Sequence, residues 1–311
     1  AGYLTADIIR ITASYFIDEY RPELSFEREI AKNLFGYGKW LAGSSILFFL
    51  FDQGDDVFVG WLLGPTVLAF YQYAYRFSNA PATELSGVIT GVMFPTLSKL
   101  QDKPNELRST FLKSLRITAF AAFPSAFGIA VVTPSFVRAF LGSDWTAMIL
   151  PTQILAIFGL IRALARTIGP VWKAIGRPDL ITKISILKVT LLALLIYPAT
   201  SRYGIPGTAA LIVGINLFII MPIDLTIVTR LVETNYTTLA RQMIYPLVAS
   251  SAMASGTWYL HLTLTVSPLI EFIVLVISGV ALYVIISLLL ERHFRWDIGT
   301  DLRHIMGEVK Q

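Results

Sequence analysis

The stretch from Lys39 to Gly64 is long and apolar enough to cross a lipid bilayer, yet it carries three aspartates near its centre. Asp52, Asp55 and Asp56 follow the spacing i, i+3, i+4, which places them on one face of a helix. An acidic side chain at the middle of a membrane helix costs about 2.5–3.5 kcal/mol on insertion scales. This stretch therefore predicts a membrane helix whose acidic face meets water, a partner or a substrate path.

The composition agrees with a membrane protein. Of 311 residues, 55% are hydrophobic and 15% are charged, with a mean hydropathy of +0.64, whereas soluble domains are about 45–50% apolar and about 25% charged. Several apolar runs of about 20 residues predict an all-α polytopic membrane protein. The absence of cysteine excludes disulfides and thiol chemistry. The three histidines show no ligand spacing, so we expect no metal site. We also expect no other cofactor and no nucleic-acid partner.

Apolar runs separated by polar turns predict about eight transmembrane helices. The aspartate helix is followed by a turn at Gly64–Pro65, and a second helix is expected to reach Leu97. A third is expected to end near Val132, and the others are expected at about residues 147–174, 180–200, 208–231, 238–260 and 268–290. Residues 1–17 resemble the tail of a preceding membrane helix, which predicts the C-terminal portion of a longer protein. We interpret residues 18–38 as a cytoplasmic linker and residues 292–311 as an amphipathic or cytoplasmic tail.

Lysine and arginine concentrate in alternate connections of this eight-helix arrangement. The segments expected outside contain only Arg138 and Arg202, whereas each segment expected inside holds at least two basic residues. Because basic residues favour the cytoplasmic side, this pattern predicts a multi-pass protein of the inner (cytoplasmic) membrane, with linker and C-terminus in the cytoplasm.

A register argument connects the first two predicted helices. Asp52 lies twelve residues before Gly64 and Arg76 lies twelve residues after it. In an antiparallel hairpin both would lie about 18 Å from the turn, near the middle of a bilayer core about 30 Å thick. We therefore expect Asp52 and Arg76 to face each other or a shared cavity, with Glu84 deeper toward the opposite surface. Asp52 is the strongest candidate of the three aspartates.

The candidate site residues suit a transport path for an anionic substrate. Guanidinium groups bind phosphate in a bidentate manner, which favours Arg76, Arg162 and Arg166 as its cationic lining. The three aspartates and Glu84 would balance them or bind a coupling ion, H⁺ or Na⁺. Structural explanations stay open: a fixed Asp52–Arg76 pair, arginines that reach the membrane surface, and Asp55 and Asp56 near the outer surface.

An enzymatic role is the less favoured interpretation. The DQGDD sequence is loosely similar to acidic motifs of membrane prenyl and sugar-phosphate transferases, but no second acidic run follows. There is no Walker A sequence. We therefore expect a protein that is not an enzyme and has no catalytic residues.

Three segments resemble one known family. They are GWLLGPTVLAFYQYAYRFSNAPATELSGVITGVMFPTLSKLQ, FVRAFLGSDWTAMILPTQILAI and KAIGRPDL. They are similar to the polysaccharide-export flippases, the Wzx-type lipopolysaccharide and O-antigen transporters of the multidrug/oligosaccharidyl-lipid/polysaccharide (MOP) superfamily. The features that match are Gly60 and Gly64, Tyr71 with Ala74 and Arg76, Pro81, and Phe94–Pro95.

The resemblance implies a fold and an activity. The family has a V-shaped pair of six-helix bundles, with two further helices in some members, so residues 39–232 correspond to the second bundle and residues 233–291 to the extra pair. The first bundle would be missing from this sequence. The implied function is flipping of undecaprenyl-diphosphate-linked oligosaccharide by alternating access, driven by an ion gradient. The alternatives are a multidrug or cation antiporter of the same superfamily and, less favoured, a membrane glycosyltransferase or polymerase.

Overall fold

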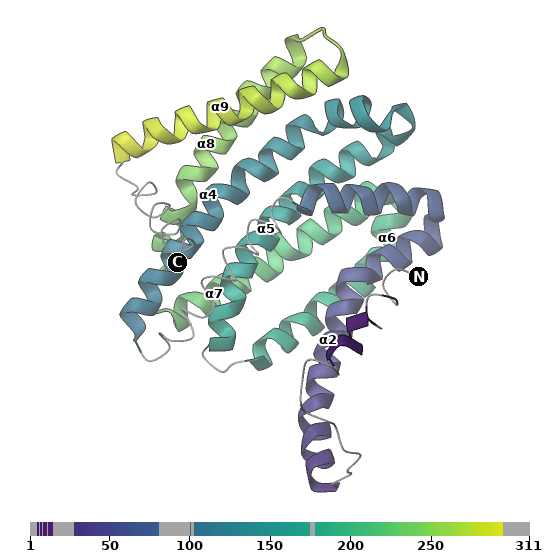
Figure 1. The fold of residues 1–311 in the computed structure, drawn as a ribbon, viewed down its shortest axis with the longest axis vertical. Coiled ribbons are helices and arrows are strands. Elements are labelled where there is room, and N and C mark those ends of the chain that lie inside the picture. The colour runs from purple at the N-terminus through teal and green to yellow at the C-terminus, as the bar shows by residue number, and fades with distance from the viewer. Residues whose placement is uncertain are drawn as a thin grey trace. The chain divides into compact units, whose positions relative to one another are not determined.

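The computed structural model is almost entirely helical in the part of the chain that it describes, and the chain divides into two compact units, Ala1–Ser45 and Ile46–Gln311. The described backbone comprises residues 5, 7, 9–10, 12–14, 28–80, 100, 103–174 and 178–294. Glu84, Pro81, Phe94 and the residues beyond 294 lie outside it. The candidate site lies within the second unit, which is shown with the rest of the chain in Figure 1.

The helices agree closely with the predicted ones. α2 begins at Arg28, inside the segment interpreted as a linker, and ends at Leu63. A helical segment follows at residues 65–80. The remaining elements are α4 (Pro104–Phe136), η1 (Val137–Leu141), η2 (Ser143–Met148), α5 (Ile149–Ala174), α6 (Pro178–Gly214), η3 (Ile215–Ile220), α7 (Met221–Leu231), α8 (Tyr236–Thr263) and α9 (Pro268–Phe294).

The predicted turn between the first two helices is confirmed. Gly64 has a φ of 87°, a left-handed conformation that glycine adopts without a steric penalty. Its N–H donates to the carbonyl of Gly60 at 3.1 Å, and its own carbonyl accepts from Leu68 at 3.1 Å. The chain therefore ends α2 and begins the segment 65–80 around a single glycine.

A second predicted turn, at residues 202–207, is also confirmed. Gly204 has φ 61° and ψ −148°, which interrupts the helical conformation inside α6. A Cβ atom on Gly207 would lie 2.3 Å from the carbonyl oxygen of Ala199, so only glycine fits there. The hydroxyls of Thr200 and Thr208 lie 2.8 Å apart across the break. Without it, the apolar helical run Thr182–Leu231 of 50 residues would be about 75 Å long, far more than one crossing needs.

Long helix α4 lies at the centre of the second unit. It packs against α5 on one side and against α8 and α9 on the other (Figure 1). Phe111 and Leu115 of α4 are fully buried in the main core. Polar contacts cross the same surfaces: Arg116 Nε donates to Gln242 Oε1 of α8 at 2.8 Å, and the Tyr283 hydroxyl of α9 donates to the α4 backbone at 2.7 Å.

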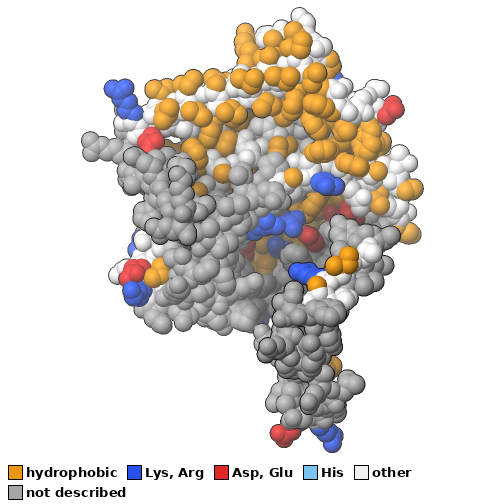
Figure 2. All heavy atoms as spheres, in the orientation of Figure 1, with side chains coloured by type: hydrophobic (Ala, Val, Ile, Leu, Met, Phe, Trp, Pro, Cys, Tyr) orange, Lys and Arg blue, Asp and Glu red, His pale blue; other side chains and the backbone are white. Residues whose placement is uncertain are grey.

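The outer surface supports a location in a bilayer. Among the described residues, four helical runs are long and apolar enough to cross a membrane: Pro104–Leu141, Ser143–Ile168, Thr182–Leu231 and Pro268–Arg292. Figure 2 shows hydrophobic side chains spread along the α8–α9 edge. The chain is therefore an all-α polytopic membrane protein. The total of eight crossings stays a prediction, because residues 81–99 lie outside the described part.

Candidate functional site

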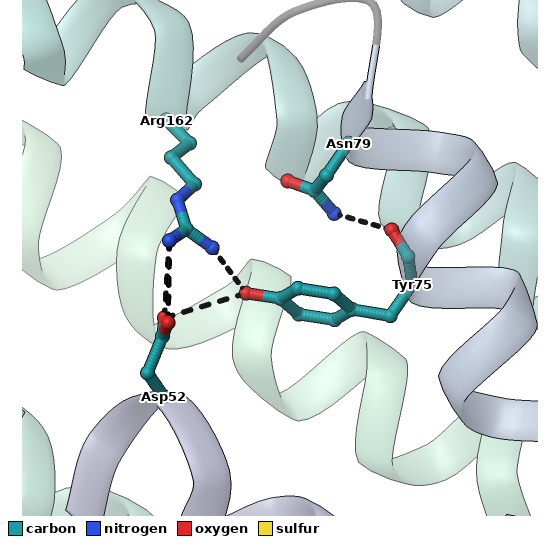
Figure 3. Close-up of polar contacts among 4 residues, drawn as sticks. All are labelled: Asp52, Tyr75, Asn79 and Arg162. Atoms are coloured by element: carbon teal, nitrogen blue, oxygen red, sulfur yellow. Dashed lines mark hydrogen bonds and ion pairs between the residues drawn. The ribbon is translucent and has the colours of Figure 1, made fainter. Parts of the chain in front are cut away.

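The central feature of the site is an ion pair between Asp52 of α2 and Arg162 of α5. The Arg162 Nη2 atom lies 3.3 Å from Asp52 Oδ1 and 3.3 Å from Asp52 Oδ2. The Tyr75 hydroxyl, from the segment 65–80, accepts a hydrogen bond from Arg162 Nη1 and donates to Asp52 at 3.5 Å. Figure 3 shows the three side chains converging from three helical segments. Arg162 and Asp52 keep 21% and 24% of their side-chain surface exposed, so the pair is accessible from an open side.

A close helix contact one turn away positions this triad. Gly159 of α5 lies so near the segment 65–80 that a Cβ atom would be 2.7 Å from the carbonyl oxygen of Ser78. Gly159 precedes Arg162 by three residues and Ser78 follows Tyr75 by three, so the two contacts are neighbours along antiparallel helices. Buried Asn79 adds a hydrogen bond of 3.1 Å from its amide to the Tyr75 carbonyl (Figure 3).

The other two aspartates contact the segment 65–80. Asp55 is only 2% exposed, and its Oδ2 accepts a hydrogen bond of 2.6 Å from the hydroxyl of fully buried Tyr71. Its Oδ1 has no hydrogen-bond partner within the described residues. Asp56 is half-buried and accepts a hydrogen bond of 2.9 Å from Gln72. All three aspartates of α2 therefore contact the protein from one face of the helix, the shared face that the spacing predicted, and Asp55 rather than Asp52 is the most buried.

The predicted direct pairing of Asp52 with Arg76 is wrong, although the predicted register is confirmed; the other form of this prediction, a cavity shared by the two side chains, stays a prediction. Asp52 meets Tyr75, and Asp55 and Asp56 meet Tyr71 and Gln72, which is the hairpin pairing expected around Gly64 to within two residues. Arg76, however, is exposed, and Asp52 pairs with Arg162 instead. Successive residues of a helix point about 100° apart, so a segment that directs Tyr75 toward α2 directs Arg76 elsewhere.

The remaining predicted residues are placed as follows. Arg166 lies on α5 one turn beyond Arg162 and is half-buried. Glu84 lies outside the described residues. Arg162 contacts Asp52 and Tyr75, and the explanation in which the arginines reach the membrane surface stays a prediction.

The structure adds two charged residues that the sequence did not single out, Lys188 of α6 and Asp224 of α7. The Lys188 Nζ atom lies 5.2 Å from the centre of the Phe51 ring on α2, a cation–π distance. Lys188 is within electrostatic range of Arg162, Asp52 and Asp224. Asp224 is 8% exposed, and its Oδ1 has no hydrogen-bond partner in the described part of the chain. The sequence signal that could have identified Lys188 and Asp224 is the presence of a charged residue within a predicted apolar helix.

The resulting site combines carboxylates of α2 and α7 with cations of α5 and α6, and these two cations lie in helical runs long and apolar enough to cross a membrane. Figure 2 shows Lys or Arg and Asp or Glu side chains together in a hollow of the face that it presents. A guanidinium and an ammonium group are suited to phosphate oxygens, and the Asp52 carboxylate that pairs with Arg162 is a group that an incoming anion can replace.

Comparison with known proteins agrees with the resemblance noted from the sequence. Residues 1–150 match the family model described as polysaccharide biosynthesis protein. The lipopolysaccharide biosynthesis protein WzxC of Escherichia coli (strain K12) is 32% identical over 254 residues, covering 80% of this chain and 48% of that protein. The teichuronic acid biosynthesis protein TuaB of Bacillus subtilis (strain 168) is 28% identical over 162 residues, covering 52% and 34%.

A more distant relative has a name that states a transport role. The probable low-salt glycan biosynthesis flippase Agl15 of Haloferax volcanii is 23% identical over 261 residues, covering 83% of this chain and 54% of that protein. The chain thus spans about half the length of the curated relatives it matches, or less. None of these three relatives carries a name that states a catalytic activity. By these similarities the chain belongs to the Wzx-type polysaccharide-export family of the MOP superfamily.

Proposed function

We propose that this chain forms part of a transporter that flips a lipid-linked oligosaccharide across the cytoplasmic membrane for polysaccharide or lipopolysaccharide synthesis. The names of its relatives support a role in surface-glycan synthesis, and one of them is named a flippase. The apolar helices support a path through the bilayer. In this proposal the protein moves its substrate without chemical change and is not an enzyme.

The observation that carries this proposal is the Asp52–Arg162–Tyr75 triad, because it links three helical segments through one cation. The lipid carrier would present a diphosphate, which competes with Asp52 for the Arg162 guanidinium. Displacement of Asp52 would loosen α2 from α5. A charged contact that forms in one state and is replaced in another is what alternating access requires, since a ligand shifts an equilibrium only by differential contacts.

The remaining parts of the transporter follow from the same proposal. The first helical bundle would precede this chain in the full-length protein, and residues 39–232 and 233–291 would form the second bundle and the extra pair. The C-terminus would lie in the cytoplasm, as the basic connections indicate. An ion gradient, of H⁺ or Na⁺, would drive the cycle, with the aspartate face of α2 as the place where the ion binds.

The experiment is complementation of a strain whose own flippase gene is deleted, using the full-length gene. We expect wild-type protein to restore surface polysaccharide, and Arg162→Gln to reduce it strongly while the protein is still inserted in the membrane. Arg138→Gln, an exposed arginine in η1, is the matched control and should restore polysaccharide fully. Normal polysaccharide with Arg162→Gln would refute the role of the triad.

A cation antiporter of the same superfamily is the second candidate, and the buried carboxyl of Asp55 favours it. An acidic path attracts organic cations. Under this alternative the full-length protein would confer resistance to cationic dyes and leave the polysaccharide defect uncorrected. The same strain therefore separates the two functions.

A further inference from the structure

Two neighbouring residues of α2 each hold a cation from a different helix. Asp52 holds the Arg162 guanidinium of α5, and Phe51 holds the Lys188 ammonium of α6 on its ring face. Both cations thus approach the same turn of α2, and each is within electrostatic range of the other. Like charges repel, so this placement is unfavourable unless anionic groups lie between or beside them.

The two cations are held in different ways. Arg162 has a carboxylate at 3.3 Å, whereas Lys188 has no carboxylate within ion-pair distance among the described residues and rests on an aromatic ring. Asp224, the carboxylate from α7 that acts on Lys188 most strongly, leaves its Oδ1 without a hydrogen bond in the described structure. An ammonium group has three donors, and a cation–π contact satisfies none of them as hydrogen bonds. Among the described residues no hydrogen bond or ion pair uses the donors of Lys188, and they can therefore bind an anion.

We propose that Arg162 and Lys188 together form a two-cation site for the diphosphate group of the substrate, with Asp52 and Asp224 as the counter-charges in the empty state. The inference rests on the proposed function and names the group recognised and the second residue that binds it. A diphosphate has two phosphoryl groups and matches two separate cations from α5 and α6. A planar guanidinium forms a bidentate contact with one phosphoryl group, and an ammonium acts as a point charge on the other.

The acidic neighbours limit how tightly the site binds. Asp55 and Asp56 lie one helical turn from Asp52 toward Gly64 and oppose an anion from that side, although Tyr71 and Gln72 already hydrogen-bond to them. A site that bound the diphosphate without such opposition would not release it. The arrangement is therefore suited to binding that is strong enough for recognition and weak enough for release on the other side.

Binding of inorganic pyrophosphate and of farnesyl diphosphate to the purified full-length protein, measured by calorimetry in nanodiscs of neutral lipid, tests the proposal. We expect both to bind, and Lys188→Gln and Arg162→Gln each to weaken binding about tenfold, because each removes a charge-assisted contact. Lys188→Arg should keep most of the affinity. Lys183→Gln, which removes an exposed lysine of the same helix, should leave it unchanged.

Asp224→Asn separates this role from a structural one. If Asp224 is only a counter-charge, its neutralisation removes a negative charge near Lys188. The dissociation constant for pyrophosphate should then fall about threefold. If Lys188 and Asp224 merely stabilise the fold, both single variants would weaken binding together, and this result would overturn the proposal. Lys188→Gln combined with Asp224→Asn leaves neither charge unpaired, and it should fold and still bind weakly.

Two further comparisons identify the source of the phosphate and separate the inference from the proposed function. Phosphatidylglycerol in the nanodiscs should not displace farnesyl diphosphate; displacement would assign the site to lipid headgroups and overturn the proposal. Normal diphosphate binding without complementation would refute the flippase function alone. Full complementation by Lys188→Gln would refute the two-cation site alone.

Discussion

Neutralising Arg162 should destabilise the protein by leaving Asp52 uncompensated among three helical segments. Removing one partner of a buried ion pair costs about 3–5 kcal/mol. Here the side chains retain about a fifth to a quarter of their exposure. Water therefore reaches the carboxylate, and Tyr75 still donates to it. We expect Arg162→Gln to lower the free energy of unfolding by about 2 kcal/mol, below the range for fully buried pairs.

The coupling within the pair is smaller than the cost of breaking it. Both contacts between Arg162 and Asp52 are 3.3 Å long, whereas strong charge-assisted hydrogen bonds are about 2.7–2.9 Å. Neutral hydrogen bonds between membrane helices average about 0.6 kcal/mol and reach about 1.7. A long but charged contact should fall near the upper part of that range, so we expect a coupling energy of about 1–2 kcal/mol.

A double-mutant cycle with Arg162→Gln and Asp52→Asn measures this coupling by unfolding the full-length protein in mixed micelles. The double variant should be more stable than the sum of the two single effects implies. A parallel cycle with Arg76→Gln and Asp52→Asn is the control, because Arg76 is exposed and should show additive effects. Additivity of the Arg162 cycle within about 0.5 kcal/mol, or coupling in the Arg76 cycle instead, would refute the pairing.

Three other outcomes are expected. Gly159→Ala should lower stability by about 1–3 kcal/mol, because its Cβ atom would lie 2.7 Å from a backbone carbonyl of the neighbouring segment; Gly214→Ala, which meets no atom within 4 Å, should be neutral or stabilising in the same unfolding assay. Tyr71→Phe should cost about 1–3 kcal/mol by removing the hydroxyl that donates to a buried carboxyl group, and an unchanged unfolding midpoint would contradict that hydrogen bond. The chain has no cysteine, so Asn105→Cys, in the first turn of α4, and Ser143→Cys, at the start of η2, can be labelled from each side of the membrane. The first should react only from the cytoplasm and the second only from outside, and the reverse pattern would contradict the predicted orientation.

The sequence alone determined where the helices run and how the first hairpin pairs. Long apolar runs specify membrane helices, because a backbone in lipid must satisfy its own hydrogen bonds. Glycine and proline marked the turn at Gly64 and the break at Gly204. Counting residues from Gly64 placed Asp52 level with Arg76, and the structure brings Asp52 to Tyr75, one residue away, because the rise per residue is the same in both helices.

Only the tertiary structure decided which cation meets Asp52. Residue counting gives depth along a hairpin, but it does not give the rotation of each helix about its axis, and a rotation of one residue separates Tyr75 from Arg76. Arg162 lies 110 residues from Asp52 in the chain. It reaches Asp52 because α5 packs closely at Gly159. Such contacts depend on side-chain packing between distant helices, which no local pattern of this sequence encodes.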